Sequence, residues 1–286
     1  MTTLYNYYYL TKPGIIYGNL LTVIGGFVFA SRGHTNLALL FYTMAGTSLI
    51  IASACVTNNY IDRDIDKKMS RTDKRALVIG TVSKRNSLIY SAILGVSGVL
   101  VLGLLTNLLV LSIGIFAYIV YVIFYGVSKR RSVHGTLVGS FSGAAPIIGG
   151  YCAVTGSIDL TTGLLFALMI IWQMAHFYAI AIYRLKDYKA ASLPVLPAIK
   201  GVARTKTQIK LYIVLLLIPI IALHFYSYAG YVFTLTMTGL TVWWLYFALT
   251  QDSSKNSTKW ARSIFLRSLV LLLALALTLS VNNFLF

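Results

Sequence analysis

Nine long apolar stretches determine the architecture of this chain. Each is long enough to cross a hydrocarbon layer of about 30 Å as an α-helix. They lie at 14–31, 37–59, 86–106, 108–127, 135–155, 160–183, 208–228, 231–249 and 264–284. Because lipid offers backbone groups no hydrogen-bonding partner, segments of this kind are predicted to be transmembrane helices. We therefore predict an all-α polytopic membrane protein in which residues 1–286 form a single domain.

The placement of basic residues predicts how these helices are oriented. The chain has 24 Lys and Arg against 7 acidic residues, a net charge of +17. With nine spans, every Lys and Arg except Arg32 falls on one side of the membrane. By the positive-inside rule that side is cytoplasmic, with the N-terminus inside and the C-terminus outside. The asymmetry accounts for the net charge without nucleic acid as a partner. The absence of a signal-peptide or transit-peptide pattern favours a bacterial plasma (inner) membrane.

A polar stretch after the second apolar segment contains most of the acidic residues. It reads TNNYIDRDIDKKMSRTDKRALVIG and holds four of the seven, all of them aspartates. If the preceding helix continues, Asn58, Asp62 and Asp66 follow at four-residue spacing and share one face, whereas Asp64 points away. Stacked carboxylates repel one another unless a cation neutralises them. Such a group of oxygen ligands suits Mg²⁺ that is also bound to the oxygens of a substrate phosphate.

Basic residues surround and follow these aspartates, at Arg63, Lys67, Lys68, Arg71, Lys74 and Arg75. Cations beside a metal site suit the charge that a metal-bound phosphate retains. The alternative is a solvated loop whose aspartates only offset a run of positive charge. We favour the metal site because acidic groups tied to membrane helices are in general functional.

A second polar cluster closes the sixth apolar segment. Trp172, His176, Ala179, Tyr183 and Asp187 recur at helical spacing, so we predict that they share one face of a helix. Asp187 falls at the same cytoplasmic boundary as the first motif. Basic residues flank it at Arg184, Lys186 and Lys189. We expect the two motifs to form one site above a cavity.

Several polar groups lie within the apolar segments. His176 either hydrogen-bonds a neighbouring helix, or ligates a haem iron or holds a substrate carboxylate. Asn19 is costly in hydrocarbon and is expected to face the interior of the bundle. Trp172 taken alone is better explained as a core residue. Lys12, at the start of the first span, is expected to extend its ammonium group towards the membrane surface.

Several of these motifs resemble the UbiA superfamily of intramembrane prenyltransferases. NNYIDRDIDKKMSRTDKRAL is similar to that family's first aspartate motif. WQMAHFYAIAIYRLKDYKAASLPVLPAIKG, KPGIIYGNLLTVIGG and GTLVGSFSGAAPIIGGYCAVTG resemble the branch that attaches a farnesyl group to haem. The resemblance covers nearly the whole chain. It implies a nine-helix bundle around a central cavity that opens to the cytoplasmic side.

The resemblance also implies an activity and roles for single residues. A farnesyl group would pass from farnesyl diphosphate to a vinyl group of haem B, with Mg²⁺ as cofactor. Metal ligands would be Asn58, Asp62, Asp66 and Asp187, with Tyr183 completing the catalytic set. Diphosphate contacts would be Arg71, Lys74, Arg75 and Lys186. Acceptor contacts would be Asn19, Trp172 and His176.

Two positions depart from the wider family pattern. Asn59 stands where many members have Asp, which leaves two strong carboxylates in the first motif. Tyr183 stands where quinone-type members have Asp, which leaves a phenol to steer the acceptor.

Three other functions remain to be weighed against haem farnesylation. A related prenyltransferase would act on an aromatic or quinone-precursor acceptor, which Tyr183 and the WQMAHF stretch argue against. A transporter of an anionic substrate would carry charges at mid-membrane in broken helices, whereas here they gather at one face. An assembly factor would bind haem without needing Mg²⁺ or diphosphate. For haem farnesylation the expected partners are farnesyl diphosphate, haem B and the bilayer, with the product passed to a haem–copper oxidase or a haem A synthase.

Overall fold

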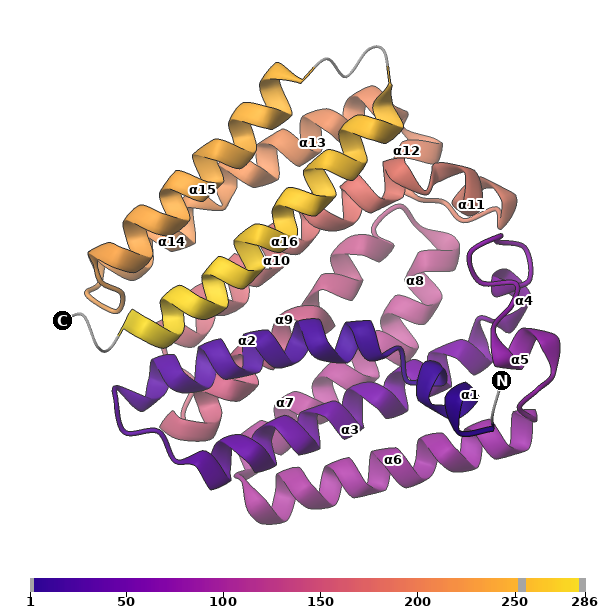
Figure 1. The fold of residues 1–286 in the computed structure, drawn as a ribbon, viewed down its shortest axis with the longest axis horizontal. Coiled ribbons are helices and arrows are strands. Elements are labelled where there is room, and N and C mark those ends of the chain that lie inside the picture. Colours follow the sequence, from indigo (N-terminus) through magenta and orange to yellow (C-terminus); the bar gives the residue numbers. More distant parts are fainter. Residues whose placement is uncertain (1–2, 252–255, 283–286) are drawn as a thin grey trace.

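A computed structural model describes residues 3–251 and 256–282, and every regular element in these ranges is helical (Figure 1). Within them, nine helices are long and apolar enough to cross a membrane, which confirms the predicted number of spans. Lys255, one of the basic residues used to predict orientation, lies outside the described residues. So do the last two residues of the predicted ninth span, 283 and 284.

The nine spans follow the apolar stretches of the sequence closely. They are α2 (Pro13–Ser31), α3 (Leu37–Ile61), α6 (Lys84–Leu105), α7 (Leu108–Ile119) continued by the π-helical η1 (Val120–Tyr125) and α8 (Gly126–Arg131), α9 (Gly135–Thr155), α10 (Leu160–Tyr183), α13 (Val202–Leu215) continued by α14 (Leu217–Phe225), α15 (Tyr231–Thr250) and α16 (Ser257–Val281). Short helices occupy the N-terminal segment and the longer connections. They are α1 (Thr3–Leu10), α4 (Arg63–Asp66), α5 (Ala76–Ile79), α11 (Leu185–Ala190) and α12 (Leu196–Ile199).

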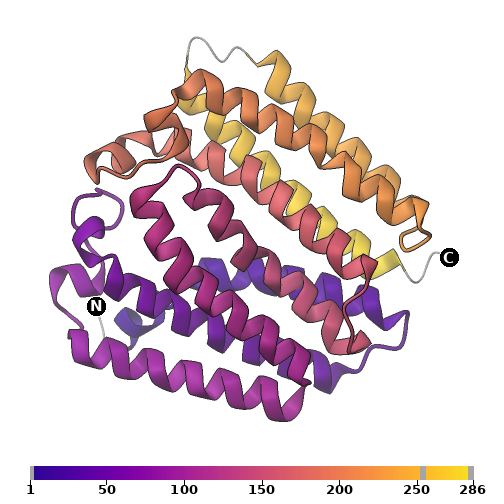
Figure 2. The ribbon, with the colours of Figure 1, turned by 180° about the vertical axis from the view of Figure 1, so that it is seen from behind.

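The short helices gather at one end of the bundle. In Figure 1, α1, α4, α5, α11 and α12 all lie at the right-hand end, whereas the α9–α10 and α14–α15 turns lie at the opposite end. Figure 2, seen from behind, shows the same grouping. The connections that follow α3 and α10 therefore share one end of the molecule, as the sequence predicts.

Glycines allow α2 and α9 to cross at very close range. A Cβ atom at Gly26 would overlap the carbonyl oxygen of Ile147, and one at Gly150 would overlap the carbonyl oxygen of Val23. Both glycines are buried. Small residues at helix crossings are the usual means of close packing in membranes, where apolar burial gives little drive for association. This crossing fixes α2 against α9, and both helices contribute residues to the cavity described below.

Replacing Gly26 with alanine is expected to lower the stability of the bundle by about 1–3 kcal/mol, because the added methyl group must push two helix backbones apart. The matched control is Gly239→Ala in α15, where an added Cβ would meet no atom within 4 Å. There alanine should be neutral or slightly stabilising through its higher helix propensity. Thermal unfolding of the purified protein in detergent measures both; equal melting temperatures would contradict the close crossing.

Candidate active site

A cavity of about 460 Å³ lies within the helix bundle. Residues of α2, α3, α7, η1, α9, α10 and α16 line it, most of them apolar. Its volume is in the range of small-molecule sites in proteins. Asn19, Trp172 and His176, the three predicted acceptor contacts, all line the cavity. Their contact with an acceptor stays a prediction, but each is placed for it.

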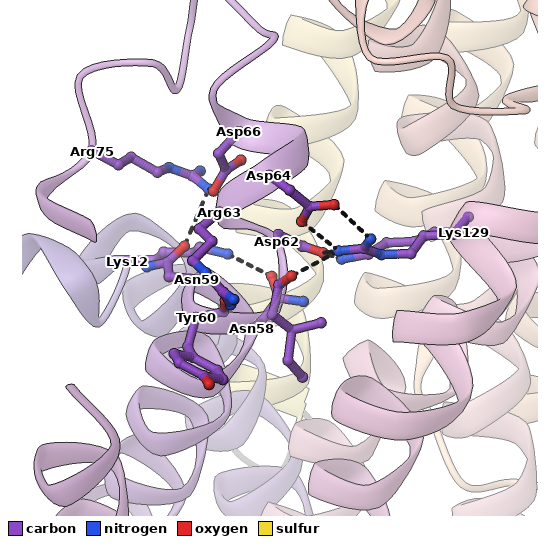
Figure 3. Close-up of polar contacts among 12 residues, drawn as sticks. Lys12, Asn58, Asn59, Tyr60, Asp62, Arg63, Asp64, Asp66, Arg75 and Lys129 are labelled. Carbon is purple, nitrogen blue, oxygen red and sulfur yellow. Dashed lines mark hydrogen bonds and ion pairs between the residues drawn. The ribbon is translucent and has the colours of Figure 1, made fainter. Parts of the chain in front are cut away.

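The first aspartate motif forms a buried column at the end of α3 (Figure 3). The helix α3 ends at Ile61, yet the N–H of Asp62 donates to the Asn58 carbonyl (2.9 Å) and the N–H of Asp66 donates to the Asp62 carbonyl (2.8 Å). These two backbone hydrogen bonds continue the helical four-residue spacing of the side chains past the end of α3 and into α4. Asn58, Asp62 and Asp66 are buried, whereas the side chain of Asp64 is 64 % exposed. The predicted outward position of Asp64 is confirmed.

Each carboxylate of this column is held by a basic side chain. Asp62 accepts hydrogen bonds from Lys129 Nζ and from Arg130 Nη2 (3.2 Å), both contributed by α8. Asp66 accepts one from Arg75 Nη1 (2.6 Å). Buried carboxylates need such partners, because an isolated charge is expensive to remove from water. Lys129 also lines the cavity, so it connects the carboxylate column to the apolar chamber.

Lys12 enters the same cluster from the start of α2. Its Nζ donates to Asn58 Oδ1 (2.9 Å), so the ammonium group is bound to the first motif. The backbone of Lys12 has a left-handed φ of 54°, an uncommon conformation outside glycine, at the turn between α1 and α2. Although part of the residue is exposed, burial of the ammonium group lowers the pKa of Lys12 to about 8.

Asn59, where many family members have Asp, has a bridging role here. Its Nδ2 donates to the Leu10 carbonyl (2.9 Å), and its Oδ1 accepts from Arg75 (3.1 Å). An aspartate carboxylate could accept from Arg75 but could not donate to Leu10. The amide thus ties the N-terminal segment and Arg75 to the site.

The second motif meets the first through a direct hydrogen bond. Asp187 is buried in α11, and its Oδ1 accepts from Ser70 Oγ (2.8 Å) in the connection after α4. Arg184 Nη1 lies 4.0 Å from the other oxygen of Asp187. Beside this bond, the two connections share a small apolar cluster formed by Ile65, Met69 and Ala191. The two motifs therefore lie together at one end of the cavity, as predicted.

The predicted continuous helical face from Trp172 to Asp187 is wrong beyond the end of α10. The chain turns at Arg184 (φ −105°, ψ 20°) before α11 begins. Tyr183, the last residue of α10, stacks against the Arg184 guanidinium (4.4 Å from carbon to ring centroid) and packs on the hydrophobic core, outside the cavity lining. A role for Tyr183 in steering an acceptor loses its geometric basis.

Tyr188, which the sequence reasoning passed over, lines the cavity instead. Burial raises the pKa of the Tyr188 phenol, and the positive charge of nearby Arg71 opposes that rise. Of the four predicted diphosphate contacts, Arg75 alone bonds a motif carboxylate within the described ranges. The other three, Arg71, Lys74 and Lys186, are exposed.

The residues of the two motifs suit Mg²⁺ in their chemistry. Asn58, Asp62, Asp66 and Asp187 present oxygen donors, which hard divalent cations prefer. Asn58 Nδ2 is buried without a hydrogen-bond partner among the described residues, so a ligand oxygen beside it would satisfy it. In the arrangement seen, however, no three His, Cys, Asp or Glu side chains of the described residues are grouped closely enough to hold a metal. The carboxylates would have to exchange their basic partners for a shared cation.

Known proteins of similar sequence were found over almost the whole chain. Residues 19–278 match the UbiA prenyltransferase family. A protoheme IX farnesyltransferase of Klebsiella pneumoniae subsp. pneumoniae is 48% identical over 277 residues, which are 96% of this chain and 94% of the relative. A protoheme IX farnesyltransferase of Yersinia pseudotuberculosis serotype O:1b is 47% identical with the same coverage.

Solved structures share the fold at much lower identity. A digeranylgeranylglyceryl phosphate synthase gives a TM-score of 0.80 at 16% identity over 99% of both chains. A UbiA homolog from Archaeoglobus fulgidus bound to GPP and Mg²⁺ gives 0.73 at 14% identity over 96% of this chain and 99% of its own. The family match and the two bacterial relatives lead to one conclusion: this chain belongs to the UbiA prenyltransferase family.

Proposed function

We propose that this chain is a haem O synthase. It transfers the farnesyl group of farnesyl diphosphate to a vinyl group of protohaem IX, adds water and releases diphosphate. Relatives at 47% and 48% identity, both named protoheme IX farnesyltransferase, support this activity. The structural observation that carries it is the Ser70–Asp187 hydrogen bond, which joins the two aspartate motifs at the end of the cavity that Lys129 lines.

The two motifs and their basic partners would hold the diphosphate end of the donor. Asn58, Asp62, Asp66 and Asp187 are the residues we assign to Mg²⁺, which acts as a Lewis acid on the leaving diphosphate when bound. We assign the diphosphate oxygens to Lys12, Arg75, Lys129 and Arg130, all of which already reach the motif side chains. Cations fixed in advance where negative charge develops stabilise the departing group at little reorganisation cost. Arg71, Lys74 and Lys186 are exposed in the two motif stretches, where their positive charge favours capture of the anion.

The apolar cavity would protect the allylic cation as its bond to diphosphate breaks. Tyr121 and Tyr125 of η1 line the cavity and stack on each other, with centroids 5.5 Å apart and planes at 25°. Lys129 Nζ lies 4.9 Å from the Tyr125 ring centroid, which supports a position of the rings beside the proposed diphosphate end. Aromatic faces attract cations. The vinyl group then attacks the allylic carbon, and water captures the new cation to give an alcohol with loss of a proton.

We place this site at the cytoplasmic face of a bacterial inner membrane. The protein is a multi-pass membrane protein, and its basic connections lie with the motifs under the predicted topology. The N-terminus would then be cytoplasmic and the C-terminus outside. The product would be handed over to a haem–copper oxidase or a haem A synthase.

Incubating the purified protein with haem B, farnesyl diphosphate and Mg²⁺, followed by mass spectrometry of the porphyrin, tests the proposal. We expect a product heavier than haem B by one farnesyl group and one hydroxyl group. EDTA should stop its formation and added Mg²⁺ should restore it, because the assigned ligands are oxygen donors. Unmodified haem together with a prenylated quinone precursor in a competition assay would overturn the choice of acceptor.

A further inference from the structure

His176 occupies a fixed position in the cavity wall. It is 7% exposed and is one of the residues that line the cavity from α10. Trp172 stacks on its ring, with centroids 4.7 Å apart and planes at 22°. Phe177 and Phe265 each lie 5.1 Å from it, centroid to centroid. Three aromatic neighbours leave the imidazole little freedom to turn.

Hydrogen bonds to α16 determine which nitrogen of this ring carries the proton. His176 Nδ1 lies 2.6 Å from Ser268 Oγ, and Ser268 Oγ donates to the Phe265 carbonyl (2.5 Å). A serine hydroxyl has a single hydrogen to donate. Because that hydrogen goes to Phe265, Ser268 Oγ accepts from an Nδ1–H. The network thus assigns a proton to Nδ1. Because the ring is buried among aromatic side chains, a second proton would leave a costly buried charge, so the imidazole is neutral and Nε2 carries a free lone pair.

No hydrogen bond to that nitrogen is formed among residues 3–251 and 256–282, where the bond of the His176 ring is the one at Nδ1. Neutral imidazole nitrogens are the commonest metal ligands in proteins, and a histidine is a frequent axial ligand of haem iron. Metal-binding histidines also donate their other N–H to an oxygen, which orients the ring. A haem carboxylate, in contrast, is itself a hydrogen-bond acceptor and gains nothing from an unprotonated nitrogen.

We propose that His176 Nε2 is the axial ligand of the iron of the haem acceptor, with Ser268 as the positioning residue that fixes the ring. The inference rests on the proposed function, since it takes haem as the substrate. His176 precedes the end of α10 by seven residues, about 10 Å along the helix. An iron held there keeps the macrocycle inside the cavity while one edge reaches towards Lys129 and the carboxylates. Ligation would therefore fix the distance between the porphyrin and the farnesyl donor.

Titration of the purified full-length protein with haem B and with metal-free protoporphyrin IX separates iron ligation from other contacts. His176→Asn is the informative variant, because its amide nitrogen can replace Nδ1 as the donor to Ser268 while Nε2 is lost. We expect its affinity for haem B to fall by about 10–100-fold. The iron–histidine band in the resonance Raman spectrum of the reduced complex should disappear. Affinity for metal-free protoporphyrin should stay within about twofold of the unmodified protein, since no metal bond is involved.

His224→Asn is the matched control, because His224 bonds the Ala229 carbonyl and lies outside the cavity lining. It should leave both titrations unchanged. Ser268→Ala should keep the iron–histidine band but shift it, as the ring loses its oriented partner. An unaltered band in His176→Asn, or equal weakening of haem and metal-free porphyrin, would overturn the ligation. A protein that binds neither porphyrin, yet prenylates another acceptor, would instead refute the proposed function.

Discussion

Replacing Asp62 or Asp66 with asparagine is expected to lower farnesyl transfer at least about 100-fold, since each change removes a carboxylate assigned to the metal. Both side chains are buried in the column that continues α3. Asparagine has nearly the same shape and can still accept hydrogen bonds from Lys129, Arg130 or Arg75, but it lacks the negative charge that Mg²⁺ requires. Haem O extracted from membranes of expressing cells and separated by chromatography gives the measurement.

Asp64→Asn is the matched control for these two substitutions. Asp64 lies between the two target residues, but its side chain is 64 % exposed and it bonds Arg130 at the surface, at 3.1 Å. An exposed ion pair of this kind contributes little, so activity should stay within about twofold of the unmodified protein. Because Asp62→Asn leaves Lys129 and Arg130 less well compensated, protein amount and size-exclusion profile must be measured in parallel. Near-normal haem O from a well-folded Asp62→Asn or Asp66→Asn protein would refute the metal assignment.

The parts of the site that follow from local spacing were predictable from the sequence. Asn58, Asp62 and Asp66 recur every four residues, and the backbone hydrogen bonds keep that spacing although the helix formally ends at Ile61. The nine spans follow from apolar length alone, and Gly and Pro are not needed to place them. The meeting of the two motifs follows from topology, because an even number of spans separates the two connections and returns the chain to the same end.

The basic partners could not be predicted, because their contacts depend on the tertiary packing. Lys12 is 46 positions from Asn58, and Lys129 is 67 positions from Asp62. The sequence around Lys12 is ordinary for a lysine at a membrane surface. The left-handed backbone conformation that redirects the chain there is adopted by Lys12 itself and not by a glycine, so the sequence does not indicate it. The turn at Arg184 likewise lacks a Pro or Gly, so helical periodicity extended the predicted face to Asp187, although the chain changes direction at Arg184.

Lys129→Met is expected to lower kcat by about 100- to 1,000-fold, the usual cost of removing one charged donor from a leaving group. Lys129 is the basic residue that both bonds Asp62 and lines the cavity, so it stands where the diphosphate separates from the allylic carbon. Methionine keeps an unbranched apolar side chain, one atom shorter than that of lysine, and removes the ammonium group, with its charge and its donors. The measurement is kcat and KM for farnesyl diphosphate with haem B held at saturation.

The neighbouring Arg131→Gln is the control, because Arg131 is exposed and belongs to the same turn of α8. It removes one positive charge from the same end of the bundle, so any general loss of electrostatic attraction for the diphosphate appears equally in both variants. A raised KM shared by the two would report that attraction. A fall in kcat confined to Lys129→Met would instead locate the residue at the bond that breaks. If Lys129→Met changed KM alone, Lys129 would hold the donor before reaction without assisting its departure, and the basic cluster would serve binding and not chemistry.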